Sequence, residues 1–420
     1  AEAHILARAR QLAPQLVELR RAIHRYPELG FEEVRTAKLV SDSLRRLGIR
    51  HRTGVGRTGI VAEIGQGEPV IALRADMDAL PISERTGLPF ASEIPGVMHA
   101  CGHDAHTAAL VGAAMLLKEM ELPPGTVRLL FQPAEETGDE EGKSGADRIV
   151  EDSAMEGVAA VVGFHNIVDR RPGTILVSPG PILAATEMFE ITIHGQASHG
   201  AYPHRGIDAI VLAAQVVNAI QSIVARRIDP MEAGVITVGT IFGGRKANIL
   251  ADRVDLTGTI RSFNDEVQKK ILEGLENACQ LVKVQGGRYE LRLSKGHPTT
   301  INDPAMSQLV RDVALRLGMK VDEEKPSPVS EDFSLLSSLA PGVYFLVGAQ
   351  LDDGRPIRHA HHANYDLDDE EFLPIAAAML AETARQYLLH PPAGGDVERA
   401  TGAPALSRRW RPADPPARRP

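Results

Sequence analysis

Short apolar runs rich in β-forming residues alternate with helical patterns in the first half of this chain, and this alternation is the strongest constraint on its fold. Expected strands cover residues 59–64, 70–74, 126–132, 159–164 and 173–177. Helical periodicity covers residues 4–25, 37–47, 105–120 and 146–150. Strands that alternate with helices favour an α/β layer whose sheet is mixed and mostly parallel.

A second pattern interrupts the first between residues 184 and 296. Its expected elements are, in order, a strand at 187–194, a helix at 208–226, strands at 234–242 and 253–261, a helix at 266–285 and a strand at 289–293. This β-α-β-β-α-β order is that of a ferredoxin-like α+β domain. A helix at 304–317, a strand at 343–347 and a helix at 370–389 then resume the first pattern. The sequence therefore predicts a discontinuous α/β domain, residues 1–183 and 297–390, into which a smaller domain of residues 184–296 is inserted.

Composition argues against several classes of partner. The net charge is −9 and the expected folded part has no basic stripe, so no nucleic-acid partner is expected. No N-terminal signal pattern and no apolar run near membrane-spanning length are recognisable, so no membrane partner is expected. Two distant cysteines give no disulfide framework and fit a cytoplasmic protein. Residues 391–420 are rich in proline and arginine and are predicted to be a disordered tail, with a short docking segment as the alternative.

The segment Met98–His106, with the sequence MHACGHDAH, concentrates one thiol and three imidazoles in nine residues. Only one residue separates Cys101 from His103, so both side chains can reach the same small volume if the backbone is extended or turning. Thiolate and imidazole are ligands that zinc prefers, and imidazole also suits manganese, cobalt and nickel. The alternative is a loop whose polar residues simply begin the helix expected at 105–120.

More carboxylates and imidazoles follow expected strands or come late in the chain. These residues are Asp76 and Asp78, Glu135 and Glu136, His165, and His361 and His362. Sites in α/β sheets gather at the carboxyl ends of strands, so these groups are expected to converge there. Taken singly, adjacent glutamates fit a solvated face, a lone histidine fits the core, and doubled histidines fit a polar loop. Together they have the residue types that a two-metal hydrolase needs.

These motifs resemble the amidohydrolase branch of the di-metal aminoacylase, carboxypeptidase and hippurate hydrolase family. The resemblance runs from Leu19–Gly30, with the sequence LRRAIHRYPELG, to Asp366. It implies a catalytic α/β domain with an inserted lid domain that dimerises. It also implies two divalent metal ions per subunit, zinc or manganese, with cobalt or nickel also suited. The implied metal ligands are Cys101, His103, Glu136, His165 and His361, and the doubled histidines leave His362 as the alternative to His361.

The resemblance also implies roles for residues that are not metal ligands. Glu135 would be the general base, and Asp76 and Asp78 would orient the histidine ligands. His199, in a glycine-flanked turn of the lid, would reach a partner subunit's active site and stabilise the oxyanion. Asn248 and Arg261 of the lid would bind the carboxylate of the substrate, although a surface salt bridge is the alternative for Arg261.

The sequence therefore predicts a cytoplasmic, homodimeric, metal-dependent amidohydrolase, with a tetramer as the alternative assembly. Its expected small-molecule substrates are N-acyl amino acids of the N-acetyl or N-benzoyl type. One alternative is a dipeptidase or carboxypeptidase that uses the same site. Another is a catalytically silent metal-binding relative, which would be indicated by the loss of Glu135 or His199, but both residues are present.

Overall fold

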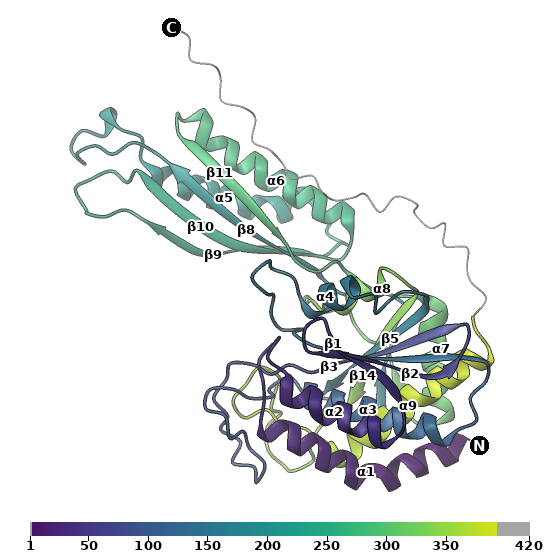
Figure 1. Ribbon diagram of the computed structural model, residues 1–420. Coiled ribbons are helices and arrows are strands. Elements are labelled where there is room, and N and C mark those ends of the chain that lie inside the picture. Colours follow the sequence, from purple (N-terminus) through teal and green to yellow (C-terminus); the bar gives the residue numbers. More distant parts are fainter. Residues whose placement is uncertain (1, 393–420) are drawn as a thin grey trace.

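The computed structural model describes residues 2–392 of the 420-residue chain. Almost all of the predicted tail, residues 391–420, therefore lies outside the described residues. Figure 1 shows two bodies, a layered α/β body and an elongated second body that extends away from it.

The α/β body is built on a mixed sheet with the strand order β1-β2-β4-β3-β5-β14-β6-β13. Its strands are β1 (Arg50–Val55), β2 (Gly59–Gln66), β3 (Val70–Asp76), β4 (Gly125–Gln132), β5 (Val158–Ile167), β6 (Thr174–Leu176), β13 (Lys320–Asp322) and β14 (Gly342–Gly348). The central strands β4, β3, β5 and β14 are parallel, whereas β1 and β2 form an antiparallel edge. The predicted mixed, mostly parallel sheet is confirmed.

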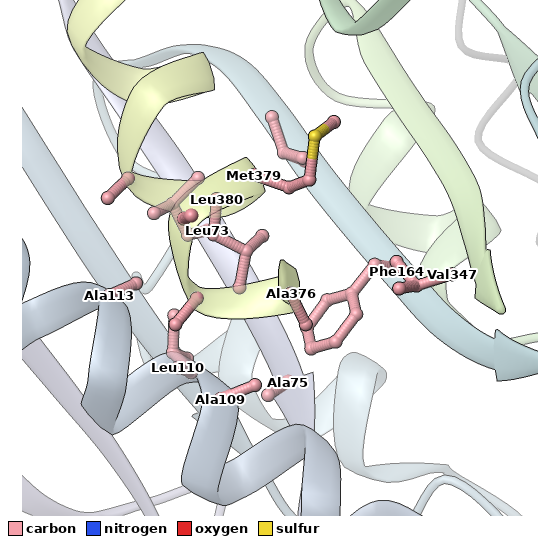
Figure 2. Close-up of a cluster of buried hydrophobic side chains, with 14 of the residues drawn as sticks. Leu73, Ala75, Ala109, Leu110, Ala113, Phe164, Val347, Ala376, Met379 and Leu380 are labelled. Carbon is pink, nitrogen blue, oxygen red and sulfur yellow. The ribbon is translucent and has the colours of Figure 1, made fainter. Parts of the chain in front are cut away.

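Helices cover both faces of this sheet. One face carries α1 (Glu2–Arg25), α2 (Val34–Arg46), α3 (His103–Glu119), α7 (Pro304–Arg316) and α9 (Asp369–Leu389). The other face carries the short helices α4 (Gly145–Glu151) and α8 (Phe333–Ser337). Figure 2 shows Leu73 of β3, Leu110 of α3 and Met379 of α9 among the buried side chains of the main core. Many alanines in α3 and α9 let these two helices approach each other and the sheet closely, so α3 is buried nearly all round.

The second body is an antiparallel sheet with the order β11-β8-β10-β9 and two helices on one face (Figure 1). Its elements are β8 (Ala185–His194), α5 (Ala209–Arg227), β9 (Gly234–Gly243), β10 (Arg253–Ser262), α6 (Asp265–Val284) and β11 (Arg288–Lys295), with the short 3-10 helix η1 (Pro203–Arg205) before α5. It has its own hydrophobic core. The predicted ferredoxin-like arrangement is confirmed, and we call this body the lid.

A small sheet of β7 (Gly180–Leu183) and β12 (Thr300–Asn302) lies where the chain passes between the bodies. These strands, like β13, have only three or four residues and were not predicted, because so short a run shows no periodicity.

Helix α5 corrects one expectation from the sequence. Within residues 2–392 it is the one helix that is long and apolar enough to cross a membrane by length and composition, so the expectation that no apolar run approaches that length is wrong. One such helix is weak evidence for a membrane span. In the structure Leu212, Val216 and Ile220 pack into the core of the lid, whereas Ile210 and Val211 are about half exposed.

Candidate active site

The central strands bring their polar carboxyl ends to one edge of the sheet. Asp76 ends β3 and pairs in register with Gln132, which ends β4. Leu73 of β3 pairs with Val162 of β5, so His165 lies three residues further along β5, at the same level as Asp76. This register places Asp76 and His165 at the same edge of the sheet, where the sequence analysis expects the site residues to gather.

A glycine at the start of α3 makes room for the Cys101–His103 pair. Gly102 has φ +94°, and a Cβ there would lie 2.2 Å from Asn166 Nδ2 and 2.6 Å from the Tyr365 hydroxyl. Only glycine fits this close approach without strain. The ligand atoms of Cys101, His103 and His165 lie within 4.8 Å of one another, with Cys101 Sγ 3.3 Å from His165 Nε2.

Glu136 and His361 join the same cluster from two distant loops. His361 Nε2 lies 3.0 Å from Glu136 Oε1, and both side chains have ligand atoms within 4.8 Å of Cys101 Sγ. The backbone of His361 is left-handed, with φ +61°, and its N–H donates to Ala100 O at 2.7 Å. His362 is turned to its own loop, where its Nδ1 accepts from Asn364 N. The structure thus brings together the five predicted ligands and places His361, not His362, among them.

His103 offers the clearest test of whether this cluster suits a metal ion. Its Nδ1 is 3.0 Å from Asp78 Oδ1, whereas its buried Nε2 has no hydrogen-bond partner among residues 2–392. An imidazole fixed at one nitrogen by a carboxylate, with the other nitrogen aimed at a cluster of donors, is the arrangement of a metal ligand. Burial lowers the pKa of His165 to about 3 and keeps this imidazole neutral, as a ligand must be. The sulfur, nitrogen and oxygen donors therefore fit divalent metal ions.

Glu135 lies beside the cluster as a carboxylate that a metal ion need not use. One of its oxygens is 4.0 Å from His103 Nε2. Burial, together with the negative charges of Glu331, Glu136 and Asp332, raises the pKa of Glu135 well above its usual range. A raised pKa makes this carboxylate a stronger proton acceptor than an ordinary glutamate, which suits a general base.

A buried arginine behind Glu135 was missed from the sequence. The Arg74 guanidinium is within 2.7 Å of carboxylate oxygens of Asp76, Glu331 and Asp332. Arg74 is fully buried and balances part of this negative charge. Arg74 stands two residues before Asp76, but nothing in the spacing of Glu331 and Asp332 connects them to this motif.

His106 belongs to the supporting structure and is not a free ligand. Its Nδ1 lies 2.6 Å from Asp76 Oδ1, and its Nε2 accepts from Asn166 N at 3.1 Å. Asn166 in turn donates to Cys101 O at 2.8 Å and accepts from the Tyr365 hydroxyl at 2.6 Å. Both ring nitrogens of His106 are therefore engaged. Asp76 contacts this supporting histidine, whereas Asp78 contacts the predicted ligand His103.

The predicted lid residues are not brought to this cluster within one chain. His199 and Asn248 lie on paired segments, with Gly200 N donating to Asn248 O at 2.8 Å. Arg261 lies at the opposite end of β10, where its Nη1 donates to Thr186 Oγ1. The ten residues of β10 span about 33 Å, so Arg261 and Asn248 of one chain cannot bind the same small carboxylate.

A cavity of about 320 Å³ opens beside the two glutamates. Glu135, Glu136, Lys143, His297 and Leu335 are among its lining residues. His297 O accepts from Thr186 N at 3.0 Å, so the Arg261 end of the lid lies next to this cavity. The cavity is large enough for a small amide substrate within reach of Glu135.

Comparisons with known proteins agree with this geometry. The model of peptidase family M20/M25/M40 matches residues 72–386. An N-acetyl-L-cysteine deacetylase of Bacillus subtilis is 40% identical over 90% of this chain and 89% of its own length. Thermostable carboxypeptidase 1 of Saccharolobus solfataricus is 39% identical over 90% of this chain and 96% of its own length. The crystal structure of a dinuclear metal-binding peptidase of family M20 from Bacillus subtilis superimposes with a TM-score of 0.79, at 35% identity, over 90% of this chain and 99% of that one.

Proposed function

Since this chain belongs to peptidase family M20/M25/M40 and is a metal-dependent amidohydrolase, we propose that it cleaves N-acyl amino acids to a carboxylate and a free amino acid. The observation that carries the proposal is the convergence of five donor side chains beside Glu135. In the described part of the chain, His103 Nε2 is buried there without a hydrogen-bond partner. The name of the Bacillus subtilis relative describes this type of reaction, the removal of an acetyl group from an amino acid.

The proposed mechanism assigns each group one task. Cys101, His103, Glu136, His165 and His361 would hold two divalent ions. When bound, such ions lower the pKa of a water molecule and polarise a substrate carbonyl. Glu135 takes one proton from the attacking water, whose oxygen forms the new bond to the amide carbon. When the C–N bond breaks, Glu135 returns that proton to the leaving amine.

Asp78 contacts both a metal ligand and the backbone next to the proposed base. Its Oδ1 lies 3.0 Å from His103 Nδ1, and its Oδ2 accepts from Glu136 N at 2.9 Å. One carboxylate therefore holds both the ring of His103 and the backbone beside Glu135. This arrangement lets the two neighbouring glutamates do different work, Glu136 as a ligand and Glu135 as the base.

A second subunit is needed to complete the proposed site. In this proposal His199 and Asn248 reach the active site of the partner, while Arg261 serves the site of its own chain and binds the substrate carboxylate. No acidic side chain within residues 2–392 pairs with Arg261, which leaves its guanidinium free for such a group. The edge strand β9 supports the homodimer, because Phe242 is 69% exposed and a bare apolar edge strand calls for a partner.

The proposed enzyme is located in the cytoplasm. Both cysteines, Cys101 and Cys279, are free and buried, which supports a reducing cytoplasm. A carboxypeptidase or dipeptidase activity is the second candidate, because the relative from Saccharolobus solfataricus is named a carboxypeptidase.

A release assay tests the proposed function. Metal-stripped protein is mixed with zinc, manganese, cobalt or nickel in turn and assayed on N-acetyl amino acids, N-benzoyl amino acids and dipeptides. We expect no turnover without metal and a higher kcat/KM on the N-acyl amino acids than on the dipeptides. A preference for dipeptides would favour the second candidate, and full activity of the stripped protein would rule out the metal-dependent mechanism.

A further inference from the structure

The turn that carries Glu135 and Glu136 contains a strained residue. Ala134, directly before Glu135, has φ +45°, a conformation that residues with a Cβ rarely adopt. Such strain persists only where the surroundings hold the backbone in place. The contacts of Ala134 therefore help to decide where the Glu135 carboxylate lies.

Three hydrogen bonds hold this turn. Ala134 N donates to Glu33 Oε1 at 2.8 Å, and Gly145 N donates to Ala134 O at 2.8 Å. Glu136 N donates to Asp78 Oδ2 at 2.9 Å. Two of the three acceptors are therefore buried carboxylates. Asp78 already belongs to the site, whereas Glu33 comes from the N-terminal part of the chain and has no role in the mechanism above.

Glu33 is itself fixed independently of the turn. Its backbone carbonyl accepts from Ala37 N at 2.9 Å at the start of α2, and its Oε2 accepts from Thr58 Oγ1 at 2.5 Å. The neighbouring backbone touches the turn directly, since a Cβ on Gly30 would lie 2.9 Å from the Cβ of Ala134. The side chain of Glu33 thus acts as a rigid link from α2 and the β1–β2 turn to Ala134.

Burial of the Glu33 carboxyl group lowers the stability of the fold, which argues against a purely structural role. It is fully buried, and burial together with the charge of Asp78 raises its pKa to about 7. A neutral side chain could fill the same space without this cost. Glu33 buries an ionisable group at a cost in stability and contacts the strained turn before Glu135. A cost of this kind beside an active site indicates that the residue serves the function of the site.

We propose that Glu33 is a positioning residue for the reaction, which accepts the Ala134 amide and thereby fixes the backbone that aims Glu135. The inference rests on the proposed role of Glu135 as general base. Misplacement of a reacting group by about 1 Å can cost about 100-fold in rate, so a small shift of this turn is enough to matter.

Two conservative variants of Glu33 show whether the length of the side chain or its charge matters for the reaction. Glu33→Asp keeps the carboxylate but is one methylene shorter, so it withdraws from Ala134 N. Glu33→Gln keeps the length, and its amide oxygen still accepts from Ala134 N, while the Thr58 hydroxyl rotates to accept from the new NH₂. Glu33→Met has similar length and no acceptor, and it buries no charge, so it replaces the Asp variant if that protein does not fold.

Glu28 provides a matched control. Its carboxylate accepts from Arg35 N and Thr36 N, both at 2.8 Å, at the start of the same helix, α2. Glu28→Asp and Glu28→Gln therefore disturb α2 without touching the turn at Ala134. For every variant kcat, KM, metal content and the thermal unfolding midpoint are measured on the full-length protein loaded with metal.

We expect kcat of Glu33→Asp and Glu33→Met to fall about 10- to 100-fold with metal content unchanged and KM within about twofold. Glu33→Gln should stay within about threefold of wild type, and the Glu28 variants should change stability but not kcat. Wild-type kcat in folded Glu33→Asp and Glu33→Met, or an equal loss in Glu33→Gln, would overturn the inference. Glu135→Gln in the same assay separates the two proposals. If it stays active, the assigned base is wrong. If it is inactive while Glu33→Asp and Glu33→Met are normal, only the positioning role fails.

Discussion

At the scale of single residues, two adjacent glutamates are proposed to do different work. Glu136 lies 3.0 Å from His361 Nε2 inside the donor cluster, whereas Glu135 faces the negative charges of Glu331 and Asp332. The first environment suits a metal ligand, and the second suits a group that must take up a proton. The division therefore comes from the neighbours of each glutamate, since the two side chains are chemically identical.

Replacing each glutamate by glutamine should separate these roles. We expect Glu135→Gln to keep its metal content and lose about 100- to 10,000-fold in kcat, because the ligands stay and the base is gone. Glu136→Gln should lose metal as well as activity. Metal analysis by mass spectrometry beside steady-state kinetics measures both effects. Equal metal loss in the two variants would show that the roles are wrongly assigned.

The doubled histidines can be separated in the same way. His361→Ala should lower the metal occupancy, because His361 Nε2 belongs to the donor cluster. His362→Ala should leave the occupancy unchanged, since its ring accepts from the nearby Asn364 N. Titration of stripped protein with zinc, followed by calorimetry, compares the two. Weaker binding in the His362 variant alone would move the ligand by one residue.

At the scale of elements, much of the site follows from the sequence because it lies where strands end. Asp76, Glu135 and His165 each lie at or near the carboxyl end of a strand, and parallel strands bring these ends to one edge. Periodicity and motifs were enough to predict this much. The contact of Arg74 with Glu331 joins residues that are 257 apart and share no motif, so no sequence pattern indicates it. Tertiary packing alone makes that contact.

The short elements set a second limit on prediction. Strand β13 has three residues, fewer than a periodic pattern needs, yet it forms one edge of the large sheet. Just after it, Glu324 is 7% exposed, and its Oε2 has no hydrogen-bond partner within the described part of the chain. Glu324 stands in a run of charged residues, which is typical of an exposed segment, so its burial was not predicted.

Glu324 should make stability depend on pH. Burial raises its pKa from the usual 4.5 to about 8. Below pH 4.5 both the folded and the unfolded protein hold the proton, so no stability is lost there. Between pH 4.5 and pH 8 only the unfolded protein releases it, so the free energy of unfolding falls by up to about 1.4 kcal/mol per pH unit.

Glu324→Gln should remove this loss. Urea unfolding of the variant and wild type from pH 5 to pH 8 should give a difference in the free energy of unfolding that grows with pH. The exposed neighbour Glu323 provides the control, and Glu323→Gln should follow wild type at each pH. Parallel curves for Glu324→Gln and wild type would contradict the burial of a protonated carboxyl group at this position.

At the scale of the whole molecule, the lid separates residues that the reaction is proposed to use together. His199 and Asn248 share one end of the lid, and Arg261 lies at the other end, beside Thr186. Figure 1 shows that the lid strands run away from the α/β body, so the far end of the lid cannot close on its own site without a large rearrangement. Motifs show which residues a lid carries, but only the structure shows that they lie at opposite ends. We propose that two chains resolve this separation, each offering the far end of its lid to the active site of the other.

Subunit mixing tests this account most directly. Glu135→Gln and His199→Ala should each be nearly inactive, the first without a base and the second without the oxyanion donor that its partner needs. Mixed under conditions that exchange subunits, they form hybrid dimers in which one of the two sites has its own Glu135 and the partner's intact His199. Random exchange makes half the dimers hybrids, so turnover should recover to about a quarter of wild type. Hybrid dimers that are detected by native mass spectrometry but recover no turnover would contradict a site shared between two chains.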